Sequence, residues 1–277
     1  MNNEQTFSDD NFLYLQRFLQ SGSGYHLTPS KVYLLESRLK PLLEKYRLED
    51  YNKIVNQIRL NPTSPISEDV IESMTVNETF FFRDDTPFRI LKENILPPYI
   101  KNQDEIKIWS AACSSGQEPY SIAMTIEEIR RGYPDFKYEI HASDISKFVI
   151  KRAREGVFMG HEVERGLPVS YKTRYFSELE NNRWQITNKL KDTILFFEQN
   201  LCHGSDNFRG PYDIIFLRNV LIYFDNDLKL KVLRKINKAL KPGGTLILGT
   251  SENIYDMSLG FKREPELSGI YKKKENE

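Results

Sequence analysis

A loop of small residues and an acidic residue stand at a spacing that suits a ribose-bearing cofactor. Residues 106–124 read IKIWSAACSSGQEPYSIAM: an apolar β-type run leads into small residues at 111–116 and then into a helix that starts near Glu118. Small side chains let backbone N–H groups approach a ligand closely, and the positive end of the helix dipole lies beside them. A second β-type run, residues 138–143, stops at Asp144, about twenty-five residues after the loop.

A second segment, TVNETFFFRD at residues 75–84, could contribute to the same site. Only one glycine remains in the loop, so the cofactor fingerprint is weak by itself and needs such support. A capped helix end followed by core aromatic residues would have the same sequence pattern, so this segment alone does not establish a cofactor site. Its polar residues are Asn77, Glu78, Thr79 and Arg83.

A third segment, GPYDIIFLRNVLIYF at residues 210–224, is an apolar run that ends in polar groups. Arg218 and Asn219 stand at its carboxyl end, where open α/β sheets bind their ligands. Tyr223 follows four residues after Asn219, although a core aromatic residue on a short helix would look the same.

The elements that must position these residues fall into two parts. Residues 1 to about 85 have apolar residues spaced three and four apart, which predicts helices. Thr28-Pro29 is a typical start for one of them, and Pro41 is expected to kink or divide that helix. From about residue 106 strands and helices alternate, which favours a mostly parallel sheet flanked by helices. The expected strands are 107–111, 138–143, 193–198, 212–217 and 244–249, and the expected helices are 119–131, 147–155 and 227–240.

Residues 175–198 do not fit simple alternation. A turn signal at Asn181-Asn182 is followed by an alternating run, RWQIT, then a polar break and TILFFE. This pattern predicts a small antiparallel insert at about residues 176–197. We therefore expect an all-helical domain with its linker at residues 1–85 and an α/β domain at residues 86–277.

The bulk composition narrows the class of protein. Lys plus Arg and Asp plus Glu both number 39, so the chain lacks the basic excess that is typical of nucleic-acid binders. It has two cysteines, and their spacing is not that of metal ligands, so we expect no disulfide framework and no metal site. We find no apolar run long enough to span a membrane, and the N-terminus is polar and acidic. These features predict a soluble, cytoplasmic protein.

Six motifs occur in this order: TVNETFFFRD, AACSSGQEPYSIAM, ASDIS, FFEQNL, DIIFLRNVLIYF and LKPGGTLILGTSE. Taken together, they resemble the chemotaxis receptor glutamate methyltransferases, the CheR family. The likeness runs from about Leu13 to Tyr271. It implies a Rossmann-like class I methyltransferase sheet with a small antiparallel β insert, preceded by an all-α domain. It also implies an enzyme that transfers a methyl group from S-adenosyl-L-methionine to glutamate side chains on the cytoplasmic helices of chemoreceptors, leaving S-adenosyl-L-homocysteine.

The resemblance assigns roles to individual residues. Arg83 and Tyr223 match the proposed catalytic pair of the family, and Arg83 also matches a cofactor contact. Asp144 is expected to accept hydrogen bonds from the ribose hydroxyls. Gln117 stands where many relatives have Glu, which affects only the role of that side chain. The cofactor contacts implied by the resemblance are Asn77, Thr79, Arg83, Glu118, Asp144, Asn200, Leu201, Asn219 and Val220.

Elementary chemistry predicts catalysis by positioning. A free glutamate has a pKa of about 4.3, so the acceptor is already an anion at neutral pH and needs no general base. The four histidines all lie outside the motifs, in agreement with this. Arg83 and Tyr223 could orient the carboxylate or the cofactor by hydrogen bonds.

Two features could bind the substrate. Lys31, Arg38 and Lys45 recur every seven residues and could form a basic stripe that steers acidic receptor helices, although such a stripe is usually a solvated face. The β insert could add a strand from a receptor C-terminal peptide, or it could be a structural flap over the sheet edge. The expected partners are chemoreceptors, without nucleic acid or membrane insertion, and the chain is expected to act as a monomer.

Other classes of protein are kept as alternatives. A non-catalytic S-adenosylmethionine-binding module would bind donor without transfer, but Arg83 and Tyr223 are both retained. A base-modifying methyltransferase commonly carries an Asn/Asp-Pro-Pro-Tyr/Phe loop, and that slot here reads RNVLIYF. A nicotinamide dehydrogenase would need G-x-G-x-x-G spacing, which is absent.

Overall fold

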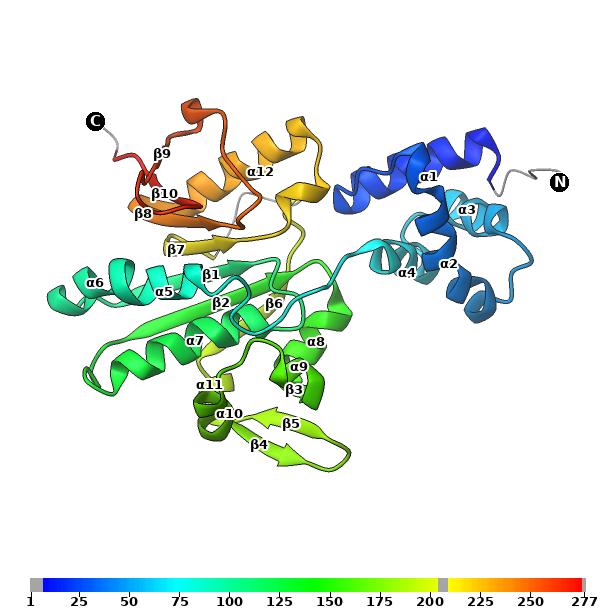
Figure 1. The fold of residues 1–277 in the computed structure, drawn as a ribbon. Helices are drawn as coiled ribbons and strands as arrows, with labels where there is room; N and C mark the ends of the chain where they lie inside the picture. The colour runs from blue at the N-terminus through cyan, green and yellow to red at the C-terminus, as the bar shows by residue number, and fades with distance from the viewer. Residues whose placement is uncertain (1–6, 204–208, 276–277) are drawn as a thin grey trace. The chain divides into compact units, whose positions relative to one another are not determined.

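The computed structural model describes residues 7–203 and 209–275, and it divides the chain into two compact units (Figure 1). The first unit comprises residues 1–76 together with 223–229, and the second comprises residues 77–222 and 230–277. In the described residues no helix has both the length and the apolar character needed to cross a bilayer.

The first unit is helical, as the sequence predicted. Apolar residues at helical spacing pack into one core, which includes Leu15, Leu19, Leu35, Leu39 and Ile58. Caps fix the ends of the helices: the Ser8 hydroxyl accepts a hydrogen bond from the backbone of Asn11, and the Asp50 carboxylate accepts one from Lys53. The helices are α1 (Asp9–Ser23), α2 (Val32–Tyr46), α3 (Tyr51–Leu60) and α4 (Pro65–Met74), with a 3-10 turn, η1 (Pro29–Lys31), before α2.

Pro41 does not divide α2, which runs without a break from Val32 to Tyr46. Pro41 lies on the exposed side of that helix, where water can satisfy the backbone carbonyl oxygen that loses its hydrogen-bond donor. Of the two expectations, division of the helix was wrong, and a kink at Pro41 stays a prediction.

The basic stripe of α2 is used inside the first unit. Arg38 donates hydrogen bonds to the backbone carbonyl oxygens of Ser73 and Thr75, at 3.1 and 2.8 Å, and so caps the end of α4. Lys45 pairs with Asp69 at 2.5 Å, and the Lys31 ammonium lies 5.3 Å from the centre of the Tyr25 ring. All three cations have partners within the first unit, and the docking role of the stripe stays a prediction.

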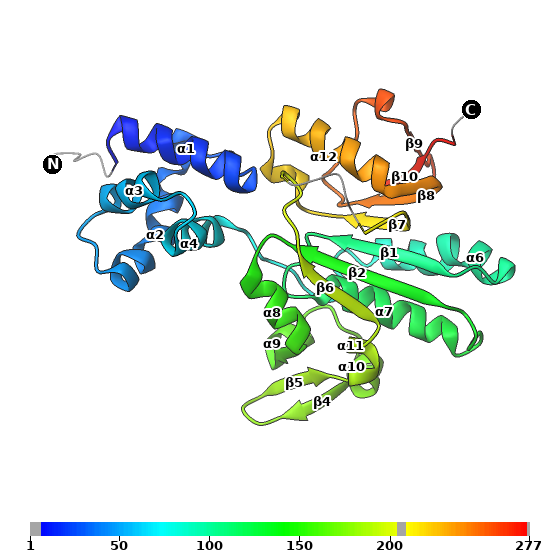
Figure 2. The same ribbon diagram turned by 180° about the vertical axis from the view of Figure 1, so that it is seen from behind.

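The second unit is built on a seven-stranded sheet with the order β6-β2-β1-β7-β8-β10-β9 (Figure 2). The first five strands in this order are mutually parallel, and β10 and β9 are antiparallel to their neighbours. Strand order reverses between β1 and β7, which is the switch point where such sheets bind ligands. The strands are β1 (Ile106–Ala111), β2 (Tyr138–Asp144), β6 (Ile194–Glu198), β7 (Tyr212–Leu217), β8 (Leu240–Leu248), β9 (Phe261–Arg263) and β10 (Ile270–Lys273).

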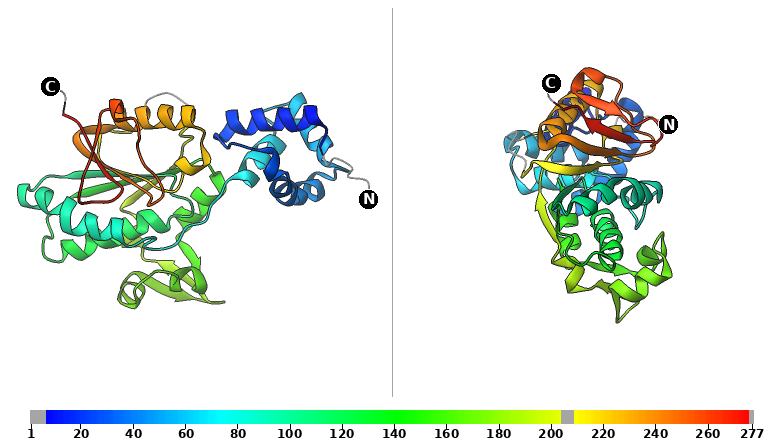
Figure 3. Two further views of the ribbon diagram at one scale, coloured as in Figure 1. Left: turned by 45° about the horizontal axis from the view of Figure 1, so that its top comes forward. Right: turned by 90° about the vertical axis from the view of Figure 1, so that its left-hand side faces the viewer.

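Helices cover this sheet and complete its core. Helix α7 and the short helices α5 and α6 lie along one face (Figures 1 and 3), and side chains such as Leu91 and Met124 join Ile108 and Ile214 in one buried cluster. The helices are α5 (Thr86–Ile90), a π turn (Leu91–Ile95), α6 (Leu96–Asn102), α7 (Gln117–Arg130), α8 (Lys147–Glu155) and α12 (Asn226–Ala239).

The β insert is real, but its bounds differ from the expectation. It is a three-stranded antiparallel sheet of β3 (Val157–Met159), β5 (Arg183–Ile186) and β4 (Phe176–Leu179), with helices α9 (Gly160–Glu164), α10 (Val169–Tyr175) and α11 (Asn188–Lys191). The predicted turn at Asn181-Asn182 joins β4 to β5, with φ of 59° and 52°. The insert thus starts earlier, and TILFFE belongs to the edge strand of the main sheet, because Ile194 and Phe196 pack into the main core.

We predict that Arg38→Ala destabilises the first unit. Two hydrogen bonds from a charged donor would be lost, so the free energy of unfolding should fall by about 2 kcal/mol. Urea unfolding followed by circular dichroism would measure it. Lys40→Ala, at an exposed position of the same helix, is the matched control. Equal stability of the two variants would contradict the capping role.

Candidate active site

The loop after β1 is shaped by three residues with left-handed backbone. Ala112, Ser114 and Gly116 have φ of 63°, 50° and 98°. The backbone N–H of Cys113 donates to the carbonyl oxygen of Ser143 at 2.8 Å, which ties the loop to β2. A Cβ at Gly116 would meet the Cβ of Ala153 at 3.0 Å, so only glycine fits where α8 approaches.

Asp144 lies at the end of β2 and organises this loop. One of its carboxylate oxygens accepts a hydrogen bond from the Ser114 backbone at 2.8 Å, and the other accepts one from the Ser146 backbone at 3.0 Å. The Ser114 hydroxyl in turn donates to the carbonyl oxygen of Asn77 at 2.7 Å. Asn77, from the segment before Arg83, is therefore held beside the loop and Asp144. A carboxylate has about four lone-pair sites, so Asp144 could also accept a hydrogen bond from a hydroxyl group of a ligand.

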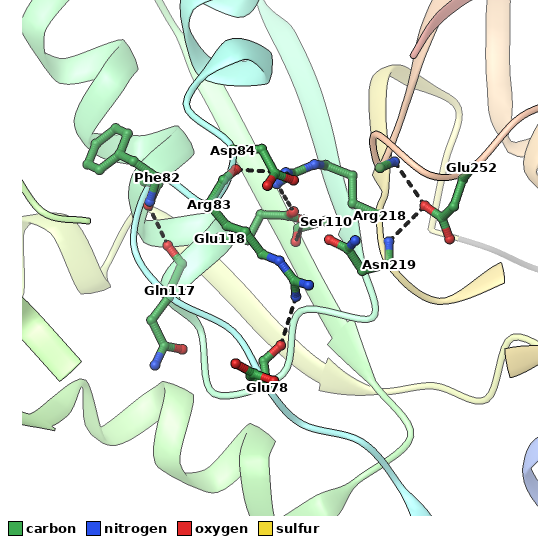
Figure 4. A network of polar contacts seen from close by, with 12 residues as sticks. Glu78, Phe82, Arg83, Asp84, Ser110, Gln117, Glu118, Arg218, Asn219 and Glu252 are labelled. Carbon is green, nitrogen blue, oxygen red and sulfur yellow. Dashed lines mark hydrogen bonds and ion pairs between the residues drawn. The ribbon is translucent and has the colours of Figure 1, made fainter. Parts of the chain in front are cut away.

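Arg218, at the end of β7, is the centre of a buried network of polar contacts (Figure 4). Its side chain is 1% exposed. Its guanidinium donates to a Glu118 oxygen at 2.9 Å, to an Asp84 oxygen at 2.8 Å and to the carbonyl oxygen of Arg83 at 2.7 Å. The Ser110 hydroxyl donates to the other Glu118 oxygen at 2.7 Å. Arg218 thus links three sequence-distant segments of the second unit.

Burial changes the ionisation of Glu118. Loss of solvation raises the pKa of this carboxyl above its usual 4.5, while Arg218 and Ser110 act in the opposite direction. The Nε atom of Arg218 is buried and has no hydrogen-bond partner within the described residues. A buried donor of this kind suits an acceptor group of a bound ligand.

Arg83 is carried by a strained turn. Phe82, Asp84 and Asp85 have φ of 52°, 67° and 40°, values that are costly for residues other than glycine. The backbone N–H of Phe82 donates to the Ser121 hydroxyl at 3.0 Å, which anchors one side of the turn on α7. The Arg83 guanidinium donates to the carbonyl oxygen of Glu78 at 2.9 Å (Figure 4). The turn is therefore held from both sides while the Arg83 side chain stays half-buried.

Glu252 holds the segment that follows β7. One of its oxygens accepts hydrogen bonds from the backbone of Asn219 at 2.7 Å and Gly249 at 2.9 Å, and the other accepts from Val220 at 2.9 Å and Leu221 at 2.8 Å. Asn219 has a left-handed φ of 58°. Successive N–H groups in such a turn form a concave anion site, which here is filled by the chain's own carboxylate.

The remaining expected cofactor contacts are Asn200 and Leu201, which follow β6, and Thr79. The backbone N–H of Gln199 donates to the carbonyl oxygen of Asp144 at 2.8 Å. Asn200 accepts a hydrogen bond from the backbone of Cys202 through its side-chain oxygen, at 2.9 Å. Leu201 is 6% exposed, whereas Thr79, in the segment before Arg83, is half-buried.

Nine of the ten expected site residues belong to the second unit, and most follow the carboxyl ends of the adjacent strands β6, β2, β1 and β7. Tyr223 belongs to the first unit instead. Its ring packs on the helical core, and its carbonyl oxygen accepts a hydrogen bond from the His26 backbone at 3.3 Å. From the sequence, Arg218 was noted at the polar end of the β7 run but given no role, and Ser110 and Glu252 were not predicted.

Comparison with known proteins identifies the family. The family model described as "CheR methyltransferase, SAM binding domain" matches residues 77–268, and "CheR methyltransferase, all-alpha domain" matches residues 10–75. The chain belongs to the CheR methyltransferase family. As the sequence predicted, it is a methyltransferase that uses S-adenosylmethionine, with an all-α domain before an α/β domain. Membership argues against the dehydrogenase and base-methyltransferase alternatives.

Curated relatives in this family match over nearly their full length. Chemotaxis protein methyltransferase 1 of Vibrio cholerae is 39% identical over 93% of this chain and 94% of its own length. The Cher2 enzyme of Pseudomonas putida is 38% identical over 85% of this chain and 87% of its own. The chemotaxis protein methyltransferase of Borreliella burgdorferi is 34% identical over 88% of each chain.

The residues at the strand ends fit the donor that the CheR family uses. Asp144 could accept hydrogen bonds from ribose hydroxyls, and the Nε–H of Arg218, which has no partner among the described residues, could donate to a carboxylate oxygen. Around Arg218 the two carboxylates of Asp84 and Glu118 outnumber one cation, which favours a positively charged ligand. Among residues 7–203 and 209–275 no group of three or more His, Cys, Asp or Glu side chains is arranged to hold a metal.

We predict that Glu252→Gln weakens both the fold and donor binding. The new amide NH2 would face backbone N–H donors, so unfolding free energy should fall by about 1–3 kcal/mol. Thermal unfolding and titration calorimetry with S-adenosylhomocysteine would measure the two effects. Glu266→Gln, an exposed carboxylate in the same unit, is the control. Wild-type stability and wild-type affinity for S-adenosylhomocysteine in Glu252→Gln would refute the role of Glu252 in holding the turn after β7.

Donor affinity should fall on acidification because of Glu118. Its raised pKa means that the folded protein binds this proton more tightly than the unfolded chain does. As pH falls through that pKa, the stability cost of the buried charge is relieved, but the negative charge that favours a cationic donor is lost. Calorimetric titration from pH about 8 to about 5 would show the weakening. An unchanged pH dependence in Glu118→Gln would contradict the assignment.

Proposed function

We propose that this chain methylates glutamate side-chain carboxylates on the cytoplasmic helices of chemoreceptors, giving glutamate methyl esters during chemotactic adaptation. The donor is S-adenosylmethionine, the product is S-adenosylhomocysteine, and the chain acts as a cytoplasmic monomer. The observation that carries the proposal is the match of both CheR domains, joined to a polar site at the carboxyl edge of the sheet. The chemotaxis methyltransferases named above support the choice of substrate.

The donor-binding roles proposed for the site follow from its contacts. Asp144 would accept from the ribose, and Asn77 would stand beside it through the Ser114 hydroxyl. Asn219 and Val220 would contact the donor from the turn after β7, which Glu252 holds. Asn200 and Leu201 would contact the donor from the turn after β6. Thr79 and Glu118 would complete the set, the latter in its ion pair with Arg218.

The donor supplies an activated methyl group, and no proton has to move. The glutamate oxygen forms a bond to the methyl carbon as the carbon–sulfur bond breaks. Arg83 is the proposed group that orients the acceptor carboxylate by a charge-assisted hydrogen bond, and Tyr223 is the proposed second donor. Histidine takes no part: His141 is buried between Tyr212 and Glu139, and burial lowers its pKa.

The charge of the site also favours binding of the donor over binding of the product. Transfer removes the positive charge of the sulfonium, so the product is less cationic than the donor. The negative excess of Asp84 and Glu118 over Arg218 would therefore hold the donor more firmly than the product. Product release is favoured without any group that must change its protonation.

We predict that Arg83→Ala and Tyr223→Phe lower turnover in folded protein. Loss of a charged hydrogen bond should cost Arg83→Ala about tenfold or more in kcat, and loss of a neutral one should cost Tyr223→Phe about fivefold. Tritiated methyl transfer to receptor-containing membranes would measure turnover, and base-labile methanol release would identify an ester.

Matched controls are available on the exposed surface of the second unit. Arg131→Ala and Tyr133→Phe change the same residue types at exposed positions and should leave kcat unchanged. Wild-type turnover of both site variants would refute their roles. Donor binding without transfer to any membrane fraction would favour a non-catalytic binding module instead.

A further inference from the structure

The aromatic run before the proposed catalytic arginine packs against the β insert. The Phe81 ring lies 5.0 Å from the ring centre of Phe158 on β3 and 5.5 Å from that of Phe176 on β4. The Phe82 ring lies 5.2 Å from the ring of Tyr171 on α10. Phe81 is fully buried by these contacts. The insert therefore supplies part of the core on which this segment rests.

Backbone contact between the two segments is equally close. Gly166, in the turn between α9 and α10, has a left-handed φ of 83°. A Cβ at this position would overlap with the carbonyl oxygen of Phe81. Only glycine allows the insert to approach the segment this closely.

Arg165, the residue before this glycine, contacts the same two residues as Arg83. Its guanidinium carbon lies 4.3 Å from the centre of the Phe80 ring, and its Nη2 lies 3.1 Å from a Glu78 carboxylate oxygen. The Arg83 guanidinium lies 5.7 Å from the same ring and donates to the carbonyl oxygen of Glu78. The two arginines thus share Phe80 and Glu78 as contacts.

We propose that the β insert positions Arg83 for methyl transfer, and that Arg165 is the positioning residue through which it acts. This proposal rests on the proposed function, because it concerns the geometry of the same acceptor site. Arg165 fixes the Phe80 ring and the Glu78 carboxylate, and these two residues limit the rotamers open to Arg83. An arginine side chain loses much rotamer entropy when it is held, so a prepared position speeds the reaction. The insert is then a scaffold of the active site, and more than a flap over the edge of the sheet.

A double-mutant cycle tests this coupling. Arg165→Ala should lower kcat about fivefold, the size expected for an exposed cation–π contact and ion pair together, with little change in the affinity for S-adenosylhomocysteine. In an Arg83→Ala background the same substitution should have no further effect, because Arg165 acts through Arg83. Single-turnover methyl transfer to receptor-containing membranes would measure all four proteins.

The controls separate positioning from general damage. Arg131→Ala removes a comparably exposed arginine with an ion pair to Glu128, and kcat should not change. Phe80→Leu should reproduce the cycle, so the proposal stays testable if Arg165→Ala folds poorly. Unchanged kcat in Arg165→Ala, or equal losses with and without Arg83, would overturn the proposal. A wild-type chain that transfers no methyl group would instead refute the proposed function.

Discussion

A single buried cation, the guanidinium of Arg218, holds together the parts of the second unit that meet at the carboxyl edge of the sheet. A charge out of contact with water must be paired, and removing one partner from such a pair typically costs about 3–5 kcal/mol. Arg218 meets this requirement with Glu118 on α7 and with Asp84 and the Arg83 carbonyl on the segment before α5. The strained backbone around Arg83 is stable because this network over-determines its conformation.

At the other strand ends, carboxylates accept hydrogen bonds from the backbone. Irregular backbone leaves N–H groups without partners, and buried N–H groups need acceptors. Asp144 supplies them after β1 and β2, and Glu252 supplies them after β7 and β8. The same rule therefore explains why acidic residues line the edge of the sheet and why several of them face inward. Four backbone N–H groups occupy the Glu252 carboxylate, so of these two residues Asp144 is the one to which a hydroxyl group of a ligand could donate.

Much of the fold could be predicted because its signals are local. Helical spacing and the end of β2 at Asp144 are visible in the sequence, and parallel topology then brings the strand ends together. The start of the insert was missed because β3 has only three residues and no periodic pattern. Arg38 looked like a solvated charge, since its carbonyl partners lie more than thirty positions away. The position of Tyr223 also depends on contacts distant in sequence, so its grouping with the helical residues could not be derived from its neighbours.

The helical unit is discontinuous in sequence, because residues 223–229 return to it long after residue 76. His26 and Gln20 form hydrogen bonds with Tyr223 and Asp225, so the returning segment is bound to α1 and the turn that follows it. Recombination that exchanged only residues 1–76 would separate them from residues 223–229, which help to stabilise them. A stable chimera of two relatives would therefore have to take residues 1–76 and residues 223–229 from the same parent.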